Sequence, residues 1–528
     1  MVVQTSRRSF VAGMAATATA AASLPVAAIA RDTGSASEEL AYRTADDLVK
    51  AIAGRQVSSR ELVDNAISRI EAFDPKINAV VVRDFERARA AADAADAALA
   101  KGESRALLGV PMTVKEHYAV AGLPTTRGDP KYKDWKAEVD ALVVQRLKAA
   151  GAVILGKTNV PLNLSDWQSF NEVHGTTNNP WDLSRTPGGS SGGSAAALAA
   201  GFVPLELGSD IGGSLRAPAH FCGVFSHKPT LDLVPQRSAG PPQIPAVPVR
   251  GDLAVYGPMA RSAADLALEL EVLAGPDELM EGVGYKLALP PPRHEKLTDF
   301  RVLVIDTHPL CPTADSIKSA LNGLADRLAK LGCRVLRESP KMPDLTRTTR
   351  IYGELLAAVY SLDLSPDDRA RIDAAAKALS PEDQSLAAYR LRGISANHSE
   401  WIRASRVRAA LRGQWFNLFQ EVDIVLCPPM PSLAFPHDHT PQRSRQLDID
   451  GSKIPYNDQM AWAGIATLNG LPATTMPNGR SESGLPIGVQ IIGGYPRRSQ
   501  YDCLCWAHRA RVRWFYAAAD LRRPSWQS

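Results

Sequence analysis

The chain has 528 residues, with 60 lysines and arginines against 56 aspartates and glutamates, which leaves a formal net charge of +4. So balanced a charge excludes a nucleic-acid binder that works through bulk positive charge, and we expect no nucleic-acid partner. Hydrophobic residues make up 45% and charged residues 22% of the chain, which is typical of a globular protein and not of a disordered one. A chain of this length can bury a large core without help from disulfides or metals.

Residues 1–30 have the features of an export signal. A twin-arginine pattern, SRRSFV, occupies residues 6–11, and a mild apolar stretch follows over residues 11–26. The triplet Ala28-Ile29-Ala30 is an A-x-A cleavage site. The pattern predicts a twin-arginine signal cleaved after Ala30, with the twin-arginine translocation machinery as partner during export and the periplasm as destination. The alternative is an uncleaved membrane anchor, which an alanine-rich segment favours less because it partitions weakly into lipid.

From residue 31 onward, short apolar strands alternate with helices. The segment SSRE at residues 58–61 is a capping box and predicts a helix that ends at Asp74-Pro75. Four more helices are expected, near residues 84–101, 138–150, 194–200 and 314–330. Strands are expected near residues 109–114, 152–155, 203–207, 302–305, 334–336, 423–426 and 487–492. This alternation predicts one α/β domain over residues 31–528, in which helices cover both faces of a sheet.

Six cysteines are scattered through the chain. Cys503 and Cys505 are one residue apart, but no CxxC pair or histidine-rich neighbour accompanies them. We therefore expect neither a zinc site nor a disulfide scaffold. All six cysteines are expected to be small buried apolar side chains. Besides Cys503 and Cys505 they are Cys222, Cys311, Cys333 and Cys427.

Residues 151–158, GAVILGKT, fit the phosphate-loop pattern GxxxxGK[ST] letter for letter. That loop must follow a strand, offer its backbone amides to a phosphate and open a helix. Here the four middle residues are themselves an apolar strand, and the residues after Thr158 do not begin a clear helix. The sequence therefore does not support a nucleotide-hydrolysing site.

Residues 189–193, GSSGG, fit the G-x-S-x-G nucleophile elbow of α/β-hydrolases, with Ser191 as the nucleophile. An elbow needs a strand immediately before the serine. The preceding residues 178–188 are rich in Asn, Pro and Gly and predict a loop. An elbow at Ser191 is therefore disfavoured.

Three other residues stand in a pattern that can carry chemistry. Lys115 ends the short strand at residues 109–114, and Ser190 and Ser214 lie in two Gly/Ser loops, GGSSGGS at 188–194 and GSDIGGS at 208–214. Glycine lets the backbone approach a ligand closely, and a serine behind Ile-Gly-Gly can sit where successive amides bind an oxyanion. Taken alone, each Gly/Ser loop is better interpreted as a plain turn.

Together these segments resemble the amidase signature family, whose hallmark is the GGSSGGS run followed by a Ser-Asp-Ile-Gly-Gly-Ser-type segment. The resemblance runs from about residue 44 to residue 512. The further motifs that carry it are GVPMTVK at 109–115, GKTN at 156–159, FCGV at 221–224 with KPT at 228–230, GPMARS at 257–262, NGLPA at 469–473 and GLPIGVQ at 484–490. The resemblance implies a large mixed central β-sheet covered by helices on both faces, and no cofactor or metal.

The resemblance also implies roles for individual residues. Ser214 would be the nucleophile, Ser190 a bridging serine that follows a cis peptide bond, and Lys115 the general base. The backbone amides of Ile211, Gly212, Gly213 and Ser214 would form the oxyanion hole. Leu164 is a weaker candidate for the acyl pocket, and plain core packing is the alternative for it.

The chemistry of such a triad follows from the residues themselves. A serine hydroxyl is a poor nucleophile until a base removes its proton. Lysine does so only when neutral, so burial must lower its pKa from about 10.4 by roughly 3 units. Ser190 would relay the proton from Ser214 to Lys115 and then return it to the leaving nitrogen. Asp210 and Arg216 flank the nucleophile, and either hold its loop or form a plain surface ion pair.

We therefore expect an exported serine amidohydrolase that cleaves C–N bonds of small amides, such as aryl or acyl amides or carbamates, through an acyl-enzyme. One alternative is a glutamine-hydrolysing subunit of the tRNA-dependent amidotransferase type. Another is a catalytically silent binding protein on the same fold. The partner is expected to be a small-molecule amide substrate, and the oligomeric state stays open, a homodimer being one option.

Overall fold

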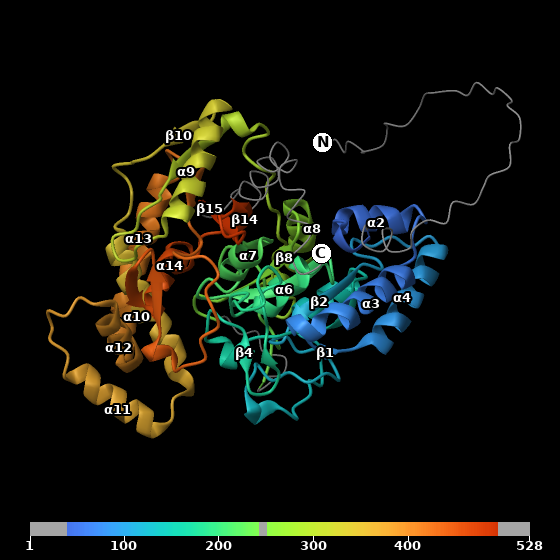
Figure 1. The fold of residues 1–528 in the computed structure, drawn as a ribbon, viewed down its shortest axis with the longest axis horizontal. Helices are drawn as coiled ribbons and strands as arrows, with labels where there is room; N and C mark the ends of the chain where they lie inside the picture. Colours follow the sequence, from blue (N-terminus) through green and yellow to red (C-terminus); the bar gives the residue numbers. More distant parts are fainter. Residues whose placement is uncertain (1–39, 242–250, 495–528) are drawn as a thin grey trace, which may run out of the picture.

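The computed structural model describes residues 40–241 and 251–494, and an eleven-stranded mixed sheet runs through them (Figure 1). The strand order is β1-β3-β2-β6-β8-β7-β14-β15-β11-β9-β10. The strands are β1 (Val80–Arg83), β2 (Pro111–Lys115), β3 (Val153–Thr158), β6 (Leu205–Asp210), β7 (Phe225–Lys228), β8 (Val255–Ala260), β9 (Arg301–Val304), β10 (Arg334–Leu336), β11 (Ile424–Cys427), β14 (Ala473–Arg480) and β15 (Pro486–Gly493).

Parallel and antiparallel pairings occupy different parts of this sheet. β3, β2 and β6 are parallel neighbours on one side, and β11, β9 and β10 are parallel neighbours on the other. The strands between them, β8, β7, β14 and β15, pair antiparallel. The predicted α/β fold with a large mixed sheet is therefore confirmed.

Alternating side chains of the strands enter different cores on the two faces. In β11, Ile424 and Leu426 join a core that also contains α9, whereas Val425 and Cys427 join a core that contains residues of α13 and α14. Because successive residues of a strand point to opposite faces, helices cover both sides of the sheet. The helices are α2 (Ala45–Ala53), α3 (Ser59–Ile77), α4 (Phe85–Ala100), α5 (Leu142–Ala149), α6 (Gly192–Ala199), α7 (Arg216–Cys222), α8 (Ala263–Leu273), α9 (Asp315–Lys330), α10 (Leu345–Tyr360), α11 (Pro366–Lys377), α12 (Leu386–Ser395), α13 (His398–Leu418) and α14 (Met460–Leu468).

The capping box at residues 58–61 starts α3, as predicted, and its two reciprocal hydrogen bonds are present. The predicted end at Asp74-Pro75 is wrong, because the helix continues to Ile77 with Pro75 inside it. Asn78 then adopts a left-handed conformation, and its N–H donates to the carbonyl of Asp74. The Asp74 carboxylate accepts the N–H groups of Ala79 and Val80, so it satisfies donors that follow the helix.

The phosphate-loop pattern at residues 151–158 and the elbow pattern at residues 189–193 both lack the local structure that these motifs need, as the sequence predicts. Gly156, Lys157 and Thr158 belong to strand β3, and no α-helix follows directly, so no phosphate loop forms. Ser191 lies at the start of α6 with no strand immediately before it. Its side chain is fully buried, and its hydroxyl contacts the backbone of Ser209.

The four cysteines in the described part of the chain are free and buried, as predicted for them. Cys503, Cys505 and the predicted signal at residues 1–30 lie outside the described residues. In residues 40–241 and 251–494, no helix is long and apolar enough to span a bilayer.

Candidate active site

Lys115 and Asp210 lie at the carboxyl ends of two neighbouring parallel strands, on the same edge of the sheet. Lys115 is the last residue of β2, and Asp210 is the last residue of β6. Because β2 and β6 are parallel, the loops that follow them start side by side. The segment before α6, which contains Ser190, reaches the same place, since Ser191 donates its N–H to the carbonyl of Ser214 over 3.2 Å.

The Lys115 ammonium group is fully buried between two serine hydroxyls. Its Nζ donates to Ser190 Oγ at 2.7 Å and to Ser209 Oγ at 2.9 Å. Burial lowers the pKa of Lys115 to about 7, although the carboxylates of Asp210 and Glu206 act in the opposite direction. The structure thus combines a lysine that can lose its proton near neutrality with a serine in hydrogen-bond contact.

The neighbour of Ser190 links its segment to Ser214, because the Ser191 N–H donates to the Ser214 carbonyl. The Gly189–Ser190 peptide bond is cis. Ser214 is 5% exposed and lies at the wall of a cavity. The described residues show no hydrogen bond between the hydroxyls of Ser214 and Ser190. Of the two hydrogen bonds that the expected relay needs, the structure therefore contains the one between Lys115 and Ser190, and it brings the segment of Ser214 close to that of Ser190. Catalytic hydrogen bonds are often long in a protein without substrate.

Asp210 holds the loop that carries Ser214. Its carboxylate accepts the N–H groups of Gly213 and Leu215, each at 3.0 Å, and two guanidinium contacts from Arg216 at 2.8 and 3.0 Å. Burial would raise the pKa of Asp210, but the Arg216 guanidinium and these donors bring it to about 2. The expected loop-holding pair is therefore present, and it is fully buried instead of lying on the surface.

Carbonyl groups of the same loop are anchored from two distant segments. Trp167 donates from its indole nitrogen to the carbonyl of Gly212 at 2.8 Å, and the Tyr352 hydroxyl donates to the carbonyl of Ile211 at 2.6 Å. The N–H of Gly213 is committed to Asp210. The amides of Ile211, Gly212 and Ser214 donate to no described residue, and Gly212 and Ser214 line the cavity beside them.

The cavity beside Ser214 has a volume of about 240 Å³ and is mostly apolar. Its charged groups already have partners inside the protein. Asp166 contacts Arg445 and the Tyr456 hydroxyl, each at 2.6 Å, and Arg390 contacts Asp458 at 3.1 Å. The apolar wall includes Leu164, Trp167, Leu356, Ala357, Ile394 and Met460. Leu164 therefore lines this cavity, and its role in an acyl pocket stays a prediction.

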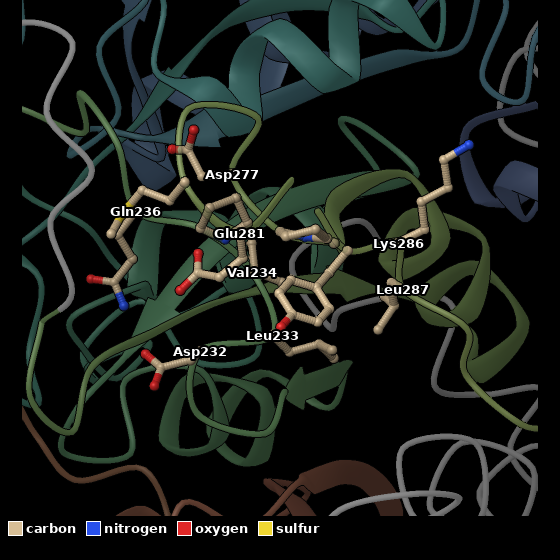
Figure 2. Close-up of a pocket in the computed structure, with 13 residues that line it drawn as sticks. Asp232, Leu233, Val234, Gln236, Asp277, Glu281, Lys286 and Leu287 are labelled. Atoms are coloured by element: carbon tan, nitrogen blue, oxygen red, sulfur yellow. The ribbon is translucent and has the colours of Figure 1, made fainter. Parts of the chain in front are cut away.

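A second cavity, of about 280 Å³, opens elsewhere on the molecule (Figure 2). Asp232, Asp277 and Glu281 lie around it together with the apolar side chains of Leu233, Val234 and Leu287, and none of the three predicted catalytic residues lines it (Figure 2). In the part of the chain that the structure describes, no group of three or more His, Cys, Asp or Glu side chains is arranged to hold a metal ion.

Sequence reasoning missed three residues that shape the site. Ser209 contacts the lysine, and it lies inside the GSDIGGS segment that the motif already marked. Trp167 and Tyr352 anchor the loop from positions 45 and 141 residues away from their partners. No spacing in the sequence connects these two to the loop.

Comparisons with known proteins show the family to which the chain belongs. The Amidase family model matches residues 61–499. A glutamyl-tRNA(Gln) amidotransferase subunit from Anaeromyxobacter dehalogenans is 33% identical over 467 residues, covering 84% of this chain and 90% of the relative. The corresponding protein of Roseiflexus castenholzii is 33% identical over 464 residues, with the same coverage of both chains. By name, these relatives fit the amidotransferase-type alternative better than a small-amide hydrolase.

Solved structures of similar fold include hydrolases. A chain from an inhibitor-bound vestigial protein complex, described as bearing on the origins of an s-triazine catabolic enzyme, is 30% identical with a TM-score of 0.72, covering 89% of this chain and 98% of its own. A 6-aminohexanoate cyclic dimer hydrolase with bound substrate is 26% identical with a TM-score of 0.72, covering 92% of this chain and 100% of its own. The chain belongs to the amidase signature family and is an enzyme of the amidase class, which hydrolyses amide C–N bonds.

Proposed function

We propose that the protein hydrolyses amides through an acyl-enzyme on Ser214. Neutral Lys115 accepts a proton from Ser190 as Ser190 accepts the proton of Ser214, and the Ser214 oxygen attacks the carbonyl carbon. The amides of Ile211, Gly212 and Ser214 donate to the oxygen that becomes negative. The proton returns through Ser190 to the leaving nitrogen as the C–N bond breaks, and water then hydrolyses the ester by the reverse path.

The observation that carries this proposal is the contact between Lys115 Nζ and Ser190 Oγ at 2.7 Å in a fully buried setting. A lysine on the surface would stay protonated near neutrality and could not act as a base. Here burial lowers its pKa to about 7, so a large fraction is neutral at physiological pH.

The pH dependence of the reaction tests the role of Lys115. A base that must be neutral loses activity as pH falls through its pKa, so we expect kcat/KM to decline on the acidic side of about pH 7, approaching tenfold per pH unit. Initial rates on a neutral amide between pH 5 and 9 measure this limb. A limb near pH 10, or a flat profile over that range, would contradict a buried lysine base.

The chemistry of the cavity supports an uncharged acyl group. Its wall is mostly apolar, and the carboxylate of Asp166 and the guanidinium of Arg390 are paired within the protein. A charged substrate would have to break these pairs or bury its own charge without a partner, and both are costly. We therefore propose small amides with an apolar aliphatic or aryl acyl group as substrates.

The second candidate is a glutamine-hydrolysing amidotransferase-type subunit, and the names of the curated relatives favour it. Butyramide and L-glutamine make a matched test, because butyramide is the glutamine side-chain amide without the α-amino and α-carboxylate groups. We expect kcat/KM for ammonia release to be about 100-fold higher with butyramide, since glutamine brings two charges to a site whose charges are already paired. Faster turnover of glutamine would support the second candidate instead.

A further inference from the structure

Two carboxyl groups that the proposed mechanism does not use are buried behind the catalytic lysine. Glu206 lies on β6 and Glu269 on α8, and the side chains of both are fully buried. Thr113 and Glu206 are register partners in the parallel pair β2–β6, and Thr113 Oγ1 donates to Glu206 Oε1 at 2.5 Å. Lys115 follows Thr113 by two residues in β2, so the side chains of Lys115 and Thr113 lie on the same face of the sheet as Glu206.

The two carboxyl groups differ in how well they are satisfied as anions, because hydroxyl donors from Thr113, Ser194 and Thr158 lower the pKa of Glu206, whereas Glu269 has no such donor among the described residues. Glu206 Oε2 and both carboxyl oxygens of Glu269 have no hydrogen-bond partner among the described residues. A buried carboxylate without donors is expensive, whereas a protonated carboxyl costs much less. Burial therefore favours the protonated form of both groups, although at Glu206 the three hydroxyl donors and Lys115 act in the opposite direction.

The surroundings of Glu206 offer one cation, Lys115, and one further acid, Glu269. Glu269 in turn faces Glu206 and Asp265. The charges of Asp210 and Glu206 both raise the pKa of Lys115, and the charge of Lys115 in turn helps to lower the pKa of the neighbouring His117. The uncharged groups beside Glu206 are the hydroxyls of Thr113, Thr158, Ser194 and Tyr118.

We propose that Glu206 is a positioning residue that holds a proton in place of Lys115, so that the lysine is free to act as the base. The inference rests on the proposed role of Lys115. When Glu206 is protonated it offers no charge to hold an ammonium group, and Lys115 can be neutral. When Glu206 is ionised it stabilises the protonated, inactive lysine.

The electrostatics of the pair agree with this exchange. Burial raises the pKa of Glu206 to about 7 and lowers that of Lys115 to about 7, so the two groups titrate over the same range. Two groups coupled in this way lose protons in steps that belong to the pair. Burial and the neighbouring Glu206 raise the pKa of Glu269 well above its usual range, which keeps Glu269 protonated throughout.

The test compares Glu206→Gln with Glu269→Gln, two isosteric changes of buried carboxyls. Glu206→Gln removes the charge that stabilises protonated Lys115, so the acidic limb of kcat/KM should shift by about one unit to lower pH and become steeper. Glu269→Gln replaces a group that is already neutral and should leave the limb in place. Thr113→Val, which removes a donor to Glu206 and preserves side-chain shape, should shift the limb in the same direction by less.

Rates are normalised to the active-enzyme concentration from fluorophosphonate titration, so partial misfolding does not enter the comparison. An unmoved limb in Glu206→Gln and Thr113→Val would overturn the inference, and so would an equal shift in Glu269→Gln. If kcat/KM of the unaltered enzyme does not decline on the acidic side of about pH 7, the role of Lys115 itself is overturned instead. The two failures are therefore distinguishable.

Discussion

Replacing Ser214 with alanine is expected to lower kcat/KM for amide hydrolysis about 10⁵-fold, with little change in stability. The hydroxyl is the atom that attacks the carbonyl in the proposed mechanism, and no other group stands in for it. Its side chain is small and lies at the cavity wall, so its loss leaves the loop contacts of Asp210 and Arg216 intact. Initial rates on a neutral amide, with thermal unfolding of both proteins, measure the two quantities.

Ser191→Ala is the matched control. Ser191 is the nucleophile of the rejected elbow hypothesis, and among the described residues its hydroxyl makes hydrogen bonds only with the backbone of Ser209, at 3.3 and 3.4 Å. Both contacts are long, and losing the two together is worth on the order of 1 kcal/mol, so kcat/KM should stay within about tenfold. A larger loss in Ser191→Ala than in Ser214→Ala would show that the wrong serine has been assigned.

Replacing Asp210 with asparagine is expected to lower both the stability and the rate. Asp210 is the buried anion that faces Arg216, and removing one partner of a buried ion pair costs about 3–5 kcal/mol of unfolding free energy. The carboxylate also fixes the N–H groups of Gly213 and Leu215 on either side of Ser214. Losing these two anchors should displace the loop that carries Ser214 and the oxyanion amides, and this should lower kcat about 100-fold in the folded enzyme, because the nucleophile and the oxyanion donors act only in the correct geometry.

Asp423→Asn separates the two effects. Asp423 is a buried carboxylate paired with Arg293 and Arg301 at the far part of the sheet, and its partners are about a third exposed. Its loss should destabilise the protein by less and leave kcat unchanged. Equal losses of kcat in the two variants would mean that the effect of Asp210→Asn is general destabilisation.

Much of the fold follows from local signals in the sequence. The strands β3, β9 and β11 are short apolar runs with clear boundaries, and the capping box fixes the start of α3. Helices α7 and α14 give no such signal, because every residue in them is buried and no polar face marks a helical period. At the centre of the sheet, β7 and β8 are buried along their whole length, so no alternation of polar and apolar residues marks them as strands.

The site was predictable to the extent that it is local in sequence. Lys115 ends the segment GVPMTVK, whereas Ser190 and the loop at 211–214 belong to glycine-rich segments, and the order of these segments matches the family motifs. The anchors of the loop, Trp167 and Tyr352, come from segments that meet only in the folded protein. Glu206 and Glu269 were also hidden, because a lone glutamate in a strand or helix pattern normally marks a solvent-facing position, and only the packing shows that these are buried.

Covalent labelling tests the central claim, a Ser214 nucleophile activated by Lys115, most directly. The protein is treated with a fluorophosphonate probe, and the modified serine is identified by peptide mass spectrometry in the unaltered enzyme and in Lys115→Ala. We predict a label on Ser214, formed at a rate at least 100-fold lower in Lys115→Ala. A label on Ser191, or a label on Ser214 that forms equally fast without Lys115, would contradict the account.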